Sequence, residues 1–326
     1  RGHKVIGLDI GFYDDAKLPA VPEPSVQIYK DVRDIELFDL EGVDAVIHLA
    51  ALSNDPLGEL DQKFTEEINR DATIRLAELA KKIGVKRFVY SSSQSMYGIS
   101  DTSSEVTEDM GNAENAITTY ARTKWESEVA IKKLNNDSFA VVCLRPATVF
   151  GWSPRLRSDV VFNSFVGCAY TAGKIEVKSD GTPWRPIVHV QDVSNAFIAA
   201  LEAPKGFVIG ESFNVGVPNG NYTVREIAEA AQGVVRGCDL IFTGEHPDSR
   251  SYRVSFEKIL NTLKDYFKPE WNLNKGGHDL VYRYKETGFN EDVFRGRDTN
   301  RLNQIQHLIN SGRIDSNLRM RNLNNQ

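Results

Sequence analysis

The segment from residue 84 to residue 124 constrains this chain more than any other. Residues 85–90 have the β-branched and aromatic content of a buried strand, and three serines follow it, Ser91, Ser92 and Ser93. After an acidic loop, Tyr120 and Lys124 lie four residues apart in a helical pattern. Side chains with this spacing project from one face of a helix, so the sequence predicts a Tyr–Lys pair that follows a strand ending in serine.

The chemistry that suits this arrangement is proton transfer coupled to hydride transfer. A Lys ammonium one turn from a Tyr favours the phenolate and lowers the Tyr pKa from about 10 toward neutrality. The tuned Tyr can take a proton from a hydroxyl group or return one to a ketone, while a Ser hydroxyl holds the same oxygen. We therefore predict Ser93, Tyr120 and Lys124 as the catalytic residues.

The Tyr-x-x-x-Lys spacing is a weak signal by itself, because the chain has 11 Tyr residues and shows the spacing more than once. Only Tyr120/Lys124 follows a strand that ends in serine. For the other two pairs the favoured interpretation is a solvated helix face: Tyr13/Lys17 and Tyr170/Lys174.

Composition and charge exclude several classes of protein. The 326 residues carry a net charge of −6, which leaves no basic footprint for nucleic acid. No apolar run approaches the ~20 residues that a membrane span needs. The six His residues lack metal-ligand spacing, so we expect no metal site. Cys143, Cys168 and Cys238 lie far apart in apolar contexts, which indicates reduced thiols in a cytoplasmic protein.

Several motifs in the right order resemble those of one family, the extended short-chain dehydrogenase/reductases, specifically the NAD-dependent nucleotide-sugar epimerase/dehydratase group. Besides the segment above, these are DAVIHLAA (44–51) and WRPIVHVQDV (184–193). The resemblance implies an α/β fold with a Rossmann-like doubly wound parallel sheet and a smaller α+β substrate domain. It also implies NAD as the cofactor, a nucleotide-diphosphate sugar as the substrate, and a homodimer formed by the helices around Asn69 and Tyr120.

The same resemblance implies a division of the chain. Residues 1–150 plus 186–217 would form the NAD-binding domain, and residues 151–185 plus 218–279 the substrate-binding domain. Residues 280–326 would form a helical tail, for which three roles stay open: it covers the substrate cleft, mediates self-association, or is a solvated surface helix.

Asp9 ends a predicted strand over residues 4–10. In dinucleotide-binding folds an acid at the end of the second strand bonds the adenosine ribose and selects NAD, so we predict this role for Asp9. A second strand implies a first strand and a glycine-rich turn for the pyrophosphate. Only eight residues precede Asp9, so we expect an N-terminally incomplete copy that lacks roughly 20–25 residues, with poor NAD binding or an exposed strand edge.

The resemblance assigns further ligand contacts. Asp31 and Val32 would lie against the adenine, and small residues after the strand at 44–51 would let the backbone approach the cofactor. The full set of expected NAD contacts is Asp9, Asp31, Val32, Leu49, Ala50, Ala51, Ser91, Tyr120 and Lys124. His48 by itself is typical of a satisfied core histidine, and Asn69 is expected to support the active-site strand through hydrogen bonds.

The expected substrate contacts are Ser93, Thr148, Arg185 and Arg250. Thr148 stands where the family usually has an Asn. Arg185 would contact the nucleotide or its phosphate, and Arg250 would reach the diphosphate, a bidentate task that suits guanidinium. We interpret Asp192 as a helix cap and Thr223 with Glu226 as a capping box.

The residues after Ser93 favour one reaction over others. Relatives that dehydrate or decarboxylate sugars carry a carboxylate just after the catalytic Ser, whereas this chain has Gln94 and Ser95. The remaining reaction is oxidation of a sugar hydroxyl by NAD, followed by return of the hydride to the opposite face of the sugar, which is epimerisation and commonly occurs at C4. Tyr120 would be the base, Lys124 would tune it and bind the nicotinamide ribose, and Ser93 would orient the sugar oxygen. An NAD(P)-dependent reductase or dehydrogenase, or a non-catalytic NAD-binding member, stays open.

Overall fold

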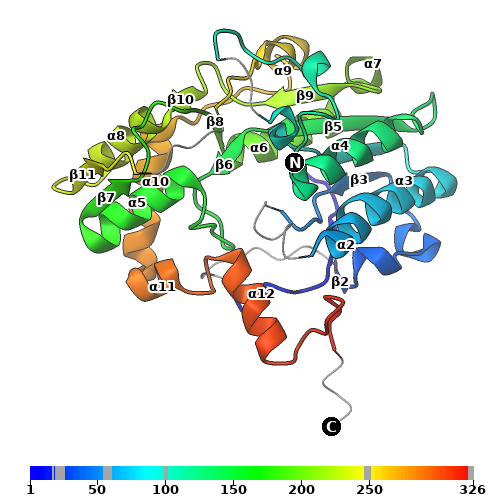
Figure 1. The fold of residues 1–326 in the computed structure, drawn as a ribbon. Helices are drawn as coiled ribbons and strands as arrows, with labels where there is room; N and C mark the ends of the chain where they lie inside the picture. The colour runs from blue at the N-terminus through cyan, green and yellow to red at the C-terminus, as the bar shows by residue number, and fades with distance from the viewer. Residues whose placement is uncertain (17, 19–25, 54–60, 99–101, 246–250, 322–326) are drawn as a thin grey trace.

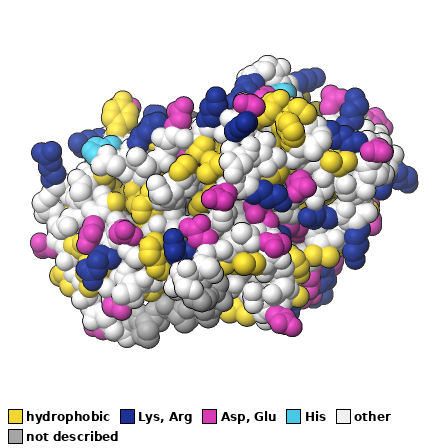
Figure 2. Space-filling model, turned by 90° about the horizontal axis from the view of Figure 1, so that it is seen from above, with side chains coloured by type: hydrophobic (Ala, Val, Ile, Leu, Met, Phe, Trp, Pro, Cys, Tyr) yellow, Lys and Arg dark blue, Asp and Glu magenta, His cyan; other side chains and the backbone are white. Residues whose placement is uncertain are grey.

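The computed structural model describes residues 1–16, 18, 26–53, 61–98, 102–245 and 251–321. In the described residues two lobes lie side by side, and the C-terminal helix α12 crosses below the gap between them (Figure 1). On the face seen from above, side chains of both charges are interspersed (Figure 2).

The first lobe is built on a parallel sheet of four strands in the order β3-β4-β5-β9. Its strands are β3 (Ala45–His48), β4 (Arg87–Ser91), β5 (Ala140–Pro146) and β9 (Ser212–Val215). In β4 and β5 nearly every residue is apolar and buried, as expected for a parallel sheet covered on both faces. Phe88 and Tyr90 pack with α3 and α4, and the alternate residue Val89 packs on the side of α6. This doubly wound arrangement confirms the predicted fold class.

The helices of this lobe begin and end close to the expected positions. The helix expected around Asn69 consists of α2 (Gln62–Thr65), a π-helical segment η3 (Glu66–Asp71) and α3 (Ala72–Ile83). The helix that carries Tyr120 is α4 (Thr119–Lys132), and short helical turns complete the lobe. The remaining elements are η1 (Val32–Asp34), η2 (Leu37–Leu40), η4 (Gln94–Tyr97), η5 (Glu108–Met110), α6 (Val190–Glu202), α7 (Lys205–Val208) and α9 (Glu257–Thr262).

The two N-terminal strands form a parallel pair of their own, β1 (Ile6–Asp9) with β2 (Val26–Tyr29). In the described residues no ladder joins this pair to the four-stranded sheet. Ile6 of β1 and Ile47 of β3 are 44% and 39% exposed. Each of β1 and β3 thus carries an exposed apolar side chain.

The second lobe combines short strands with three longer helices. One sheet has the order β10-β8-β6, and a second pairs β11 with β7. Thr223 caps α8 and Glu226 completes the predicted capping box. The elements are β6 (Thr148–Phe150), β7 (Lys174–Val177), β8 (Trp184–His189), β10 (Asn221–Thr223), β11 (Asp239–Phe242), α5 (Val161–Ala172), α8 (Val224–Val234) and α10 (Leu273–Thr287).

The interpretation of Asp192 as a helix cap is wrong. Helix α6 begins at Val190, and the residue that caps it is His189, whose Nδ1 accepts from the backbone N–H of Gln191 at 3.2 Å. Asp192 is buried and accepts hydrogen bonds from the backbone N–H groups of Glu270 and Trp271, both at 3.0 Å. Its carboxylate therefore fixes a turn that is distant in sequence.

The C-terminal tail is packed and is not a solvated surface helix. Helix α10 continues across the expected boundary at residue 280, and Leu280 and Tyr284 are buried in the second lobe. After α11 (Glu291–Arg295), helix α12 (Arg301–Asn310) and the residues beyond it pack against the first lobe. Four tail residues are buried there with Phe12, Val32, Ile35 and Leu40: Ile305, Leu308, Ile314 and Leu318.

Candidate active site

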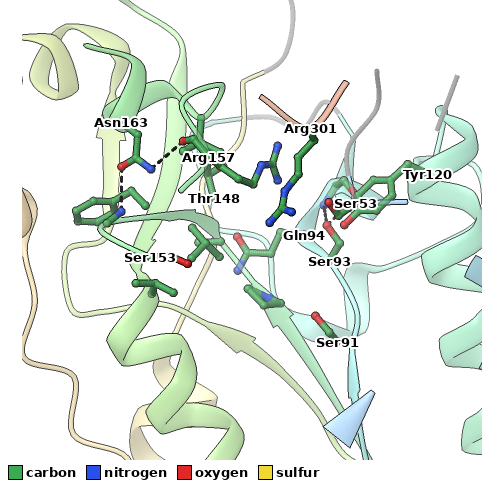
Figure 3. Close-up of a pocket in the computed structure, with 18 of the residues that line it drawn as sticks. Ser53, Ser91, Ser93, Gln94, Tyr120, Thr148, Ser153, Arg157, Asn163 and Arg301 are labelled. Carbon is green, nitrogen blue, oxygen red and sulfur yellow. Dashed lines mark hydrogen bonds between the residues drawn. The ribbon is translucent and has the colours of Figure 1, made fainter. Parts of the chain in front are cut away.

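The end of β4 and the first turns of α4 bring the predicted catalytic residues together. Ser91, Ser93 and Tyr120 line one cavity of about 440 Å³, together with Thr148 of β6 (Figure 3). Parallel strands end at the same edge of a sheet, which is where α/β folds bind ligands. The cavity therefore lies where a dinucleotide-binding fold would be expected to hold its reactive groups.

Lys124 is buried beneath this cavity. Its Nζ donates to the carbonyl oxygen of Ser91 at 2.8 Å, and it lies 4.9 Å from the ring centroid of Tyr90 and 6.0 Å from that of Tyr120. Burial lowers the pKa of Lys124 from 10.5 to about 7. Both protonation states are then populated at neutral pH, so Lys124 can exchange a proton under physiological conditions.

Ser93 is held in place by its own turn. Its Oγ accepts hydrogen bonds from the backbone N–H of Ser95 at 3.1 Å and from the Ser95 hydroxyl at 2.9 Å. Ser93 thereby caps the short helix η4. Because the Ser95 hydroxyl donates to Ser93, the Ser93 hydroxyl proton is available for an oxygen in the cavity.

A buried ion pair that we did not predict supports the serine segment. Glu128 accepts from Arg145 Nη2 at 2.6 Å and from the Ser92 hydroxyl at 2.5 Å. Burial raises the Glu128 pKa, but Arg145 and the hydroxyl donors outweigh this effect, so the pKa lies below its usual value. The Ser92 hydroxyl is thus held by Glu128, although Ser92 lines the cavity together with Ser91 and Ser93. Only the spacing of Glu128, one turn after Lys124, could have pointed to this residue.

Gln94 takes no part in acid–base chemistry. It is buried, and its Nε2 donates to the backbone carbonyl of Arg145 at 3.0 Å. Of the described residues that line the cavity, none is an Asp or a Glu.

The predicted cofactor contacts fall into two groups. Asp9 lies at the end of β1, where its Oδ1 accepts from the backbone N–H of Gly11 at 2.7 Å. Leu49 and Ala50 are exposed and Ala51 is half-buried, so the backbone after β3 is accessible as expected.

Asp31 and Val32 are engaged elsewhere. Asp31 caps η1 and forms ion pairs with Arg33 at 2.6 Å and with Arg319 of the tail at 3.2 Å. Val32 is buried in the core of the first lobe. In this structure these partners hold the Asp31 carboxylate and shield the Val32 side chain, so the structure does not bring the two residues into the cavity with Tyr120.

Two of the predicted substrate residues, Thr148 and Arg185, line a second, adjoining cavity of about 730 Å³, whereas Ser93 lines only the first. Arg185 lines it from β8, and Ser95, Thr148, Val160 and Tyr252 line both cavities. Arg250 lies outside the described residues. His48 is a satisfied core histidine as predicted, because it is buried with its Nε2 2.8 Å from the Thr73 hydroxyl. Asn69 bonds the backbone of Leu52 after β3, not the active-site strand.

Three arginines that we did not predict also line the first cavity: Arg155, Arg157 and Arg301. The described residues contain no cluster of three His, Cys, Asp or Glu side chains suited to a metal ion. Within the same residues, every helix is too short or too polar to cross a membrane.

The doubly wound sheet, with Ser, Tyr and Lys gathered at the end of one strand, defines a dinucleotide-binding protein of the α/β class. The sequence model of the NAD dependent epimerase/dehydratase family matches residues 1–216. This chain belongs to that family, and NAD is its cofactor.

Individual proteins are also similar to this chain in sequence or in structure. A UDP-glucose 4-epimerase from Bacillus subtilis is 30% identical over 254 residues, which cover 72% of this chain and 70% of that protein. The solved structure of MoeE5 in complex with UDP-glucose and NAD has a TM-score of 0.71 at 24% identity, covering 87% and 92% of the two chains. The NDP-hexosamine 5,6-dehydratase TunA has a TM-score of 0.74 at 19% identity, covering 88% and 91%. The two structures establish a shared fold.

The residues around the cavity fit NAD. Lys124 is a buried cation beside the strand end, Ser91 and the exposed backbone at Leu49 and Ala50 border the same edge of the sheet, and Asp9 ends a neighbouring strand. Arg301 also has a buried Nε without a hydrogen-bond partner in the described residues. An anionic dinucleotide would offer a counter-charge to Lys124 and a hydrogen-bond acceptor to the Arg301 Nε–H.

Proposed function

We propose that this protein is an NAD-dependent nucleotide-sugar epimerase that inverts C4 of the sugar through a transient keto-sugar. The observation that carries the proposal is the cavity that Ser91, Ser93 and Tyr120 line, with Lys124 bonded to the Ser91 carbonyl and no carboxylate among the described lining residues. Elimination of water needs a separate acid and base, whereas oxidation and reduction of one alcohol need one proton relay. The similarity to a UDP-glucose 4-epimerase supports C4.

In this mechanism each residue has one role. NAD, when bound, supplies the hydride acceptor for oxidation of the sugar carbon and the donor for its reduction. Tyr120 takes the proton of the sugar hydroxyl and later returns it. Ser93 would donate a hydrogen bond to the same oxygen, and Lys124 would hold the nicotinamide ribose and supply the positive charge that favours the phenolate.

The nucleotide part of the substrate would occupy the second cavity. Arg185, which lines that cavity, would bind the diphosphate, and Thr148 lines both cavities. We propose Arg250 as a second diphosphate contact. The sugar would then extend past Thr148 toward Tyr120.

The test is an assay of the full-length protein with UDP-, dTDP-, GDP- and CDP-sugars, followed by proton NMR and by absorbance at 340 nm. An inverted sugar without net NADH supports the epimerase. A stoichiometric change at 340 nm would instead identify a dehydrogenase or reductase. If the protein binds NAD but none of the sugars reacts, the epimerase proposal fails for these substrates.

A pair of tyrosine variants makes the assignment of the base specific. Tyr120→Phe should lower turnover by at least ~100-fold, since general base catalysis contributes about 10²–10⁴-fold. Tyr170→Phe alters the other Tyr-x-x-x-Lys pair in the second lobe, where the Tyr170 ring packs against Tyr284, and should leave turnover unchanged. Thermal unfolding of both variants controls for folding; retained turnover in Tyr120→Phe would contradict the assignment.

We also propose that the protein is a homodimer through the helices that carry Asn69 and Tyr120. On their outer surfaces, ion pairs already link the two helices within one chain: Arg70 with Glu126 at 3.1 Å and Arg122 with Glu66 at 2.7 Å. Light scattering tests this proposal, because a dimer has twice the mass of the chain. The mass of a single chain would contradict it.

A further inference from the structure

Three arginines from two distant segments converge on the first cavity. Arg155 and Arg157 belong to the loop between β6 and α5, and Arg301 begins the tail helix α12. Figure 3 shows Arg157 and Arg301 extending into the cavity toward one another. The convergence is a property of the folded chain, since about 145 residues of sequence separate the loop from the tail.

The loop that carries two of these arginines is fixed by a buried side chain. Asn163 is 1% exposed, and its Oδ1 accepts from the backbone N–H of Gly151 at 2.9 Å. Its Nδ2 donates to the backbone carbonyl of Arg157, also at 2.9 Å. The backbone position of Arg157 is therefore set before any ligand enters.

Two of the three guanidinium groups have carboxylate partners. Arg155 pairs with Asp14 at 2.7 Å and with Asp9 at 3.5 Å. Arg157 forms a bidentate pair with Asp159 at 3.0 and 2.9 Å. Both residues line the cavity, but the carboxylates of Asp9, Asp14 and Asp159 offset their charge.

Arg301 differs from the other two. Within the described residues it forms no ion pair, and its Nε is buried without a hydrogen-bond partner. Its guanidinium lies 4.1 Å from the ring centroid of Tyr13, and Nη2 donates to the backbone carbonyl of Arg155 at 3.4 Å. A cation held in this way needs an anion, because an unsatisfied buried donor costs free energy.

The electrostatics of the cluster agree with this geometry. Burial lowers the pKa of Arg301, the neighbouring Tyr13 opposes this shift, and the charges of Arg157 and Arg155 lower the pKa further. The positive charges of Arg155, Arg157 and Arg301 repel one another, and a ligand with two negative charges relieves this repulsion.

The cluster also has a definite place between the two ends of the cofactor site. Arg155 contacts Asp9, the residue expected to bind the adenosine ribose, and the same cavity reaches Tyr120 and Ser91, where the nicotinamide ribose is expected. The diphosphate is the part of NAD that connects the two riboses. The diphosphate of the nucleotide sugar has its own candidate partner, Arg185, in the second cavity.

We propose that Arg301, with Arg155 and Arg157, binds the diphosphate of NAD, so that the C-terminal tail forms part of the cofactor site. The proposal holds whichever reaction the enzyme performs. Arg301 supplies a planar fork of donors that matches two phosphate oxygens, and Tyr13 supports that fork from behind.

Calorimetric titration of the full-length protein with NAD and, separately, with UDP tests the proposal. Arg301→Gln should weaken NAD binding about tenfold, the effect of losing one charge-assisted hydrogen bond, and leave UDP binding within about twofold. Arg295→Gln is the matched control, because this tail arginine is exposed and does not line the cavity; its side chain pairs with Glu291 at 3.7 Å and contacts Cys168 Sγ at 3.9 Å. It should leave both affinities unchanged.

Every other result overturns the proposal. Unchanged NAD affinity in Arg301→Gln, or an equal loss in Arg295→Gln, removes the specific role of Arg301. A loss confined to UDP assigns the arginines to the nucleotide sugar, and an equal loss for both ligands indicates a general disturbance of the cleft. Should Arg301→Gln fail to fold by thermal unfolding, Arg157→Gln, whose side chain is 26% exposed, replaces it with the same expected outcome.

Discussion

Lys124 gives the protein a stability that depends on pH. Its pKa is about 7 in the folded protein and 10.5 in an exposed side chain, so between these values the unfolded chain binds more protons. The free energy of unfolding contributed by Lys124 therefore rises with pH across pH 7–10.5, by at most ~1.4 kcal/mol per pH unit. Urea unfolding at several pH values should show this slope in the natural protein and lose it in Lys124→Met. The exposed Lys133→Met should keep the slope, and an unaltered slope in Lys124→Met would contradict the prediction.

The buried ion pair between Glu128 and Arg145 should contribute strongly to stability. Their side chains are 2% and 3% exposed, so Glu128→Gln leaves a buried guanidinium without its counter-charge. We expect a loss of about 3–5 kcal/mol in the free energy of unfolding. On the same helix, Glu126 pairs with Arg70 at the surface, and Glu126→Gln should cost less than about 1 kcal/mol. Chemical denaturation measures the free energy of unfolding of both variants. Equal losses would show that the burial of Glu128 does not determine the contribution of its ion pair to stability.

At the scale of elements, the π-helical segment between α2 and α3 places Asn69. Its Oδ1 accepts from the backbone N–H of Leu52 at 2.8 Å, and its Nδ2 donates to the Leu52 carbonyl at 3.1 Å. Asn69→Ala leaves both backbone groups unsatisfied in a buried place, so we expect a loss of about 2–5 kcal/mol. Asn69→Asp keeps the acceptor and should cost less. Hydrogen exchange at Leu52 localises the effect, and an unchanged exchange rate would contradict it.

Gly151 controls the loop that carries Arg155 and Arg157. It has a φ of +111°, and a Cβ built there would lie 2.3 Å from Nε2 of His189. Gly151→Ala should therefore displace this loop and destabilise the protein by more than ~1 kcal/mol. Gly233→Ala is the control, because a Cβ at that helical position meets no atom within 4 Å. Thermal unfolding compares the two, and equal melting temperatures would refute the role of Gly151.

The elements that could be predicted from the sequence are those whose determining residues are close together in the sequence. The strands β4 and β5 and the helix α4 have apolar patterns that identify them without a partner, and the Ser–Tyr–Lys arrangement follows from those elements. Asp192 was misinterpreted as a cap because its partners, Glu270 and Trp271, come from a distant segment. No local pattern reports such contacts, and the role of Arg301 was missed for the same reason.

At the scale of the whole molecule, the tail connects the two lobes. Phe289 and Phe294 are buried in the second lobe, whereas Ile305 and Leu308 are buried in the first. In the sequence these residues are spread thinly among charged ones. The sequence therefore left open whether the tail covers the cleft, mediates self-association or is a solvated surface helix. Their burial shows that the tail is a strap across both lobes, anchored at each end by apolar side chains.

If the strap holds Arg301 in the cavity, then loosening its anchor should weaken cofactor binding at a distance. Leu308 is 0% exposed, and Leu308→Ala should lower the free energy of unfolding by about 2–5 kcal/mol. Because Leu308 lies on the same helix as Arg301, NAD affinity should fall as well, although Leu308 does not line the cavity.

The neighbouring residue offers the matched control. Ile309 is 40% exposed on the same helix, and Ile309→Ala should change stability by less than about 0.5 kcal/mol and leave NAD binding unchanged. Titration with NAD at a temperature where both variants are fully folded separates the two effects. A Leu308→Ala protein that loses stability but binds NAD like the natural protein would show that the anchor and the cofactor site are independent. Weaker binding in that variant alone would establish that the first lobe positions Arg301 through the buried face of α12.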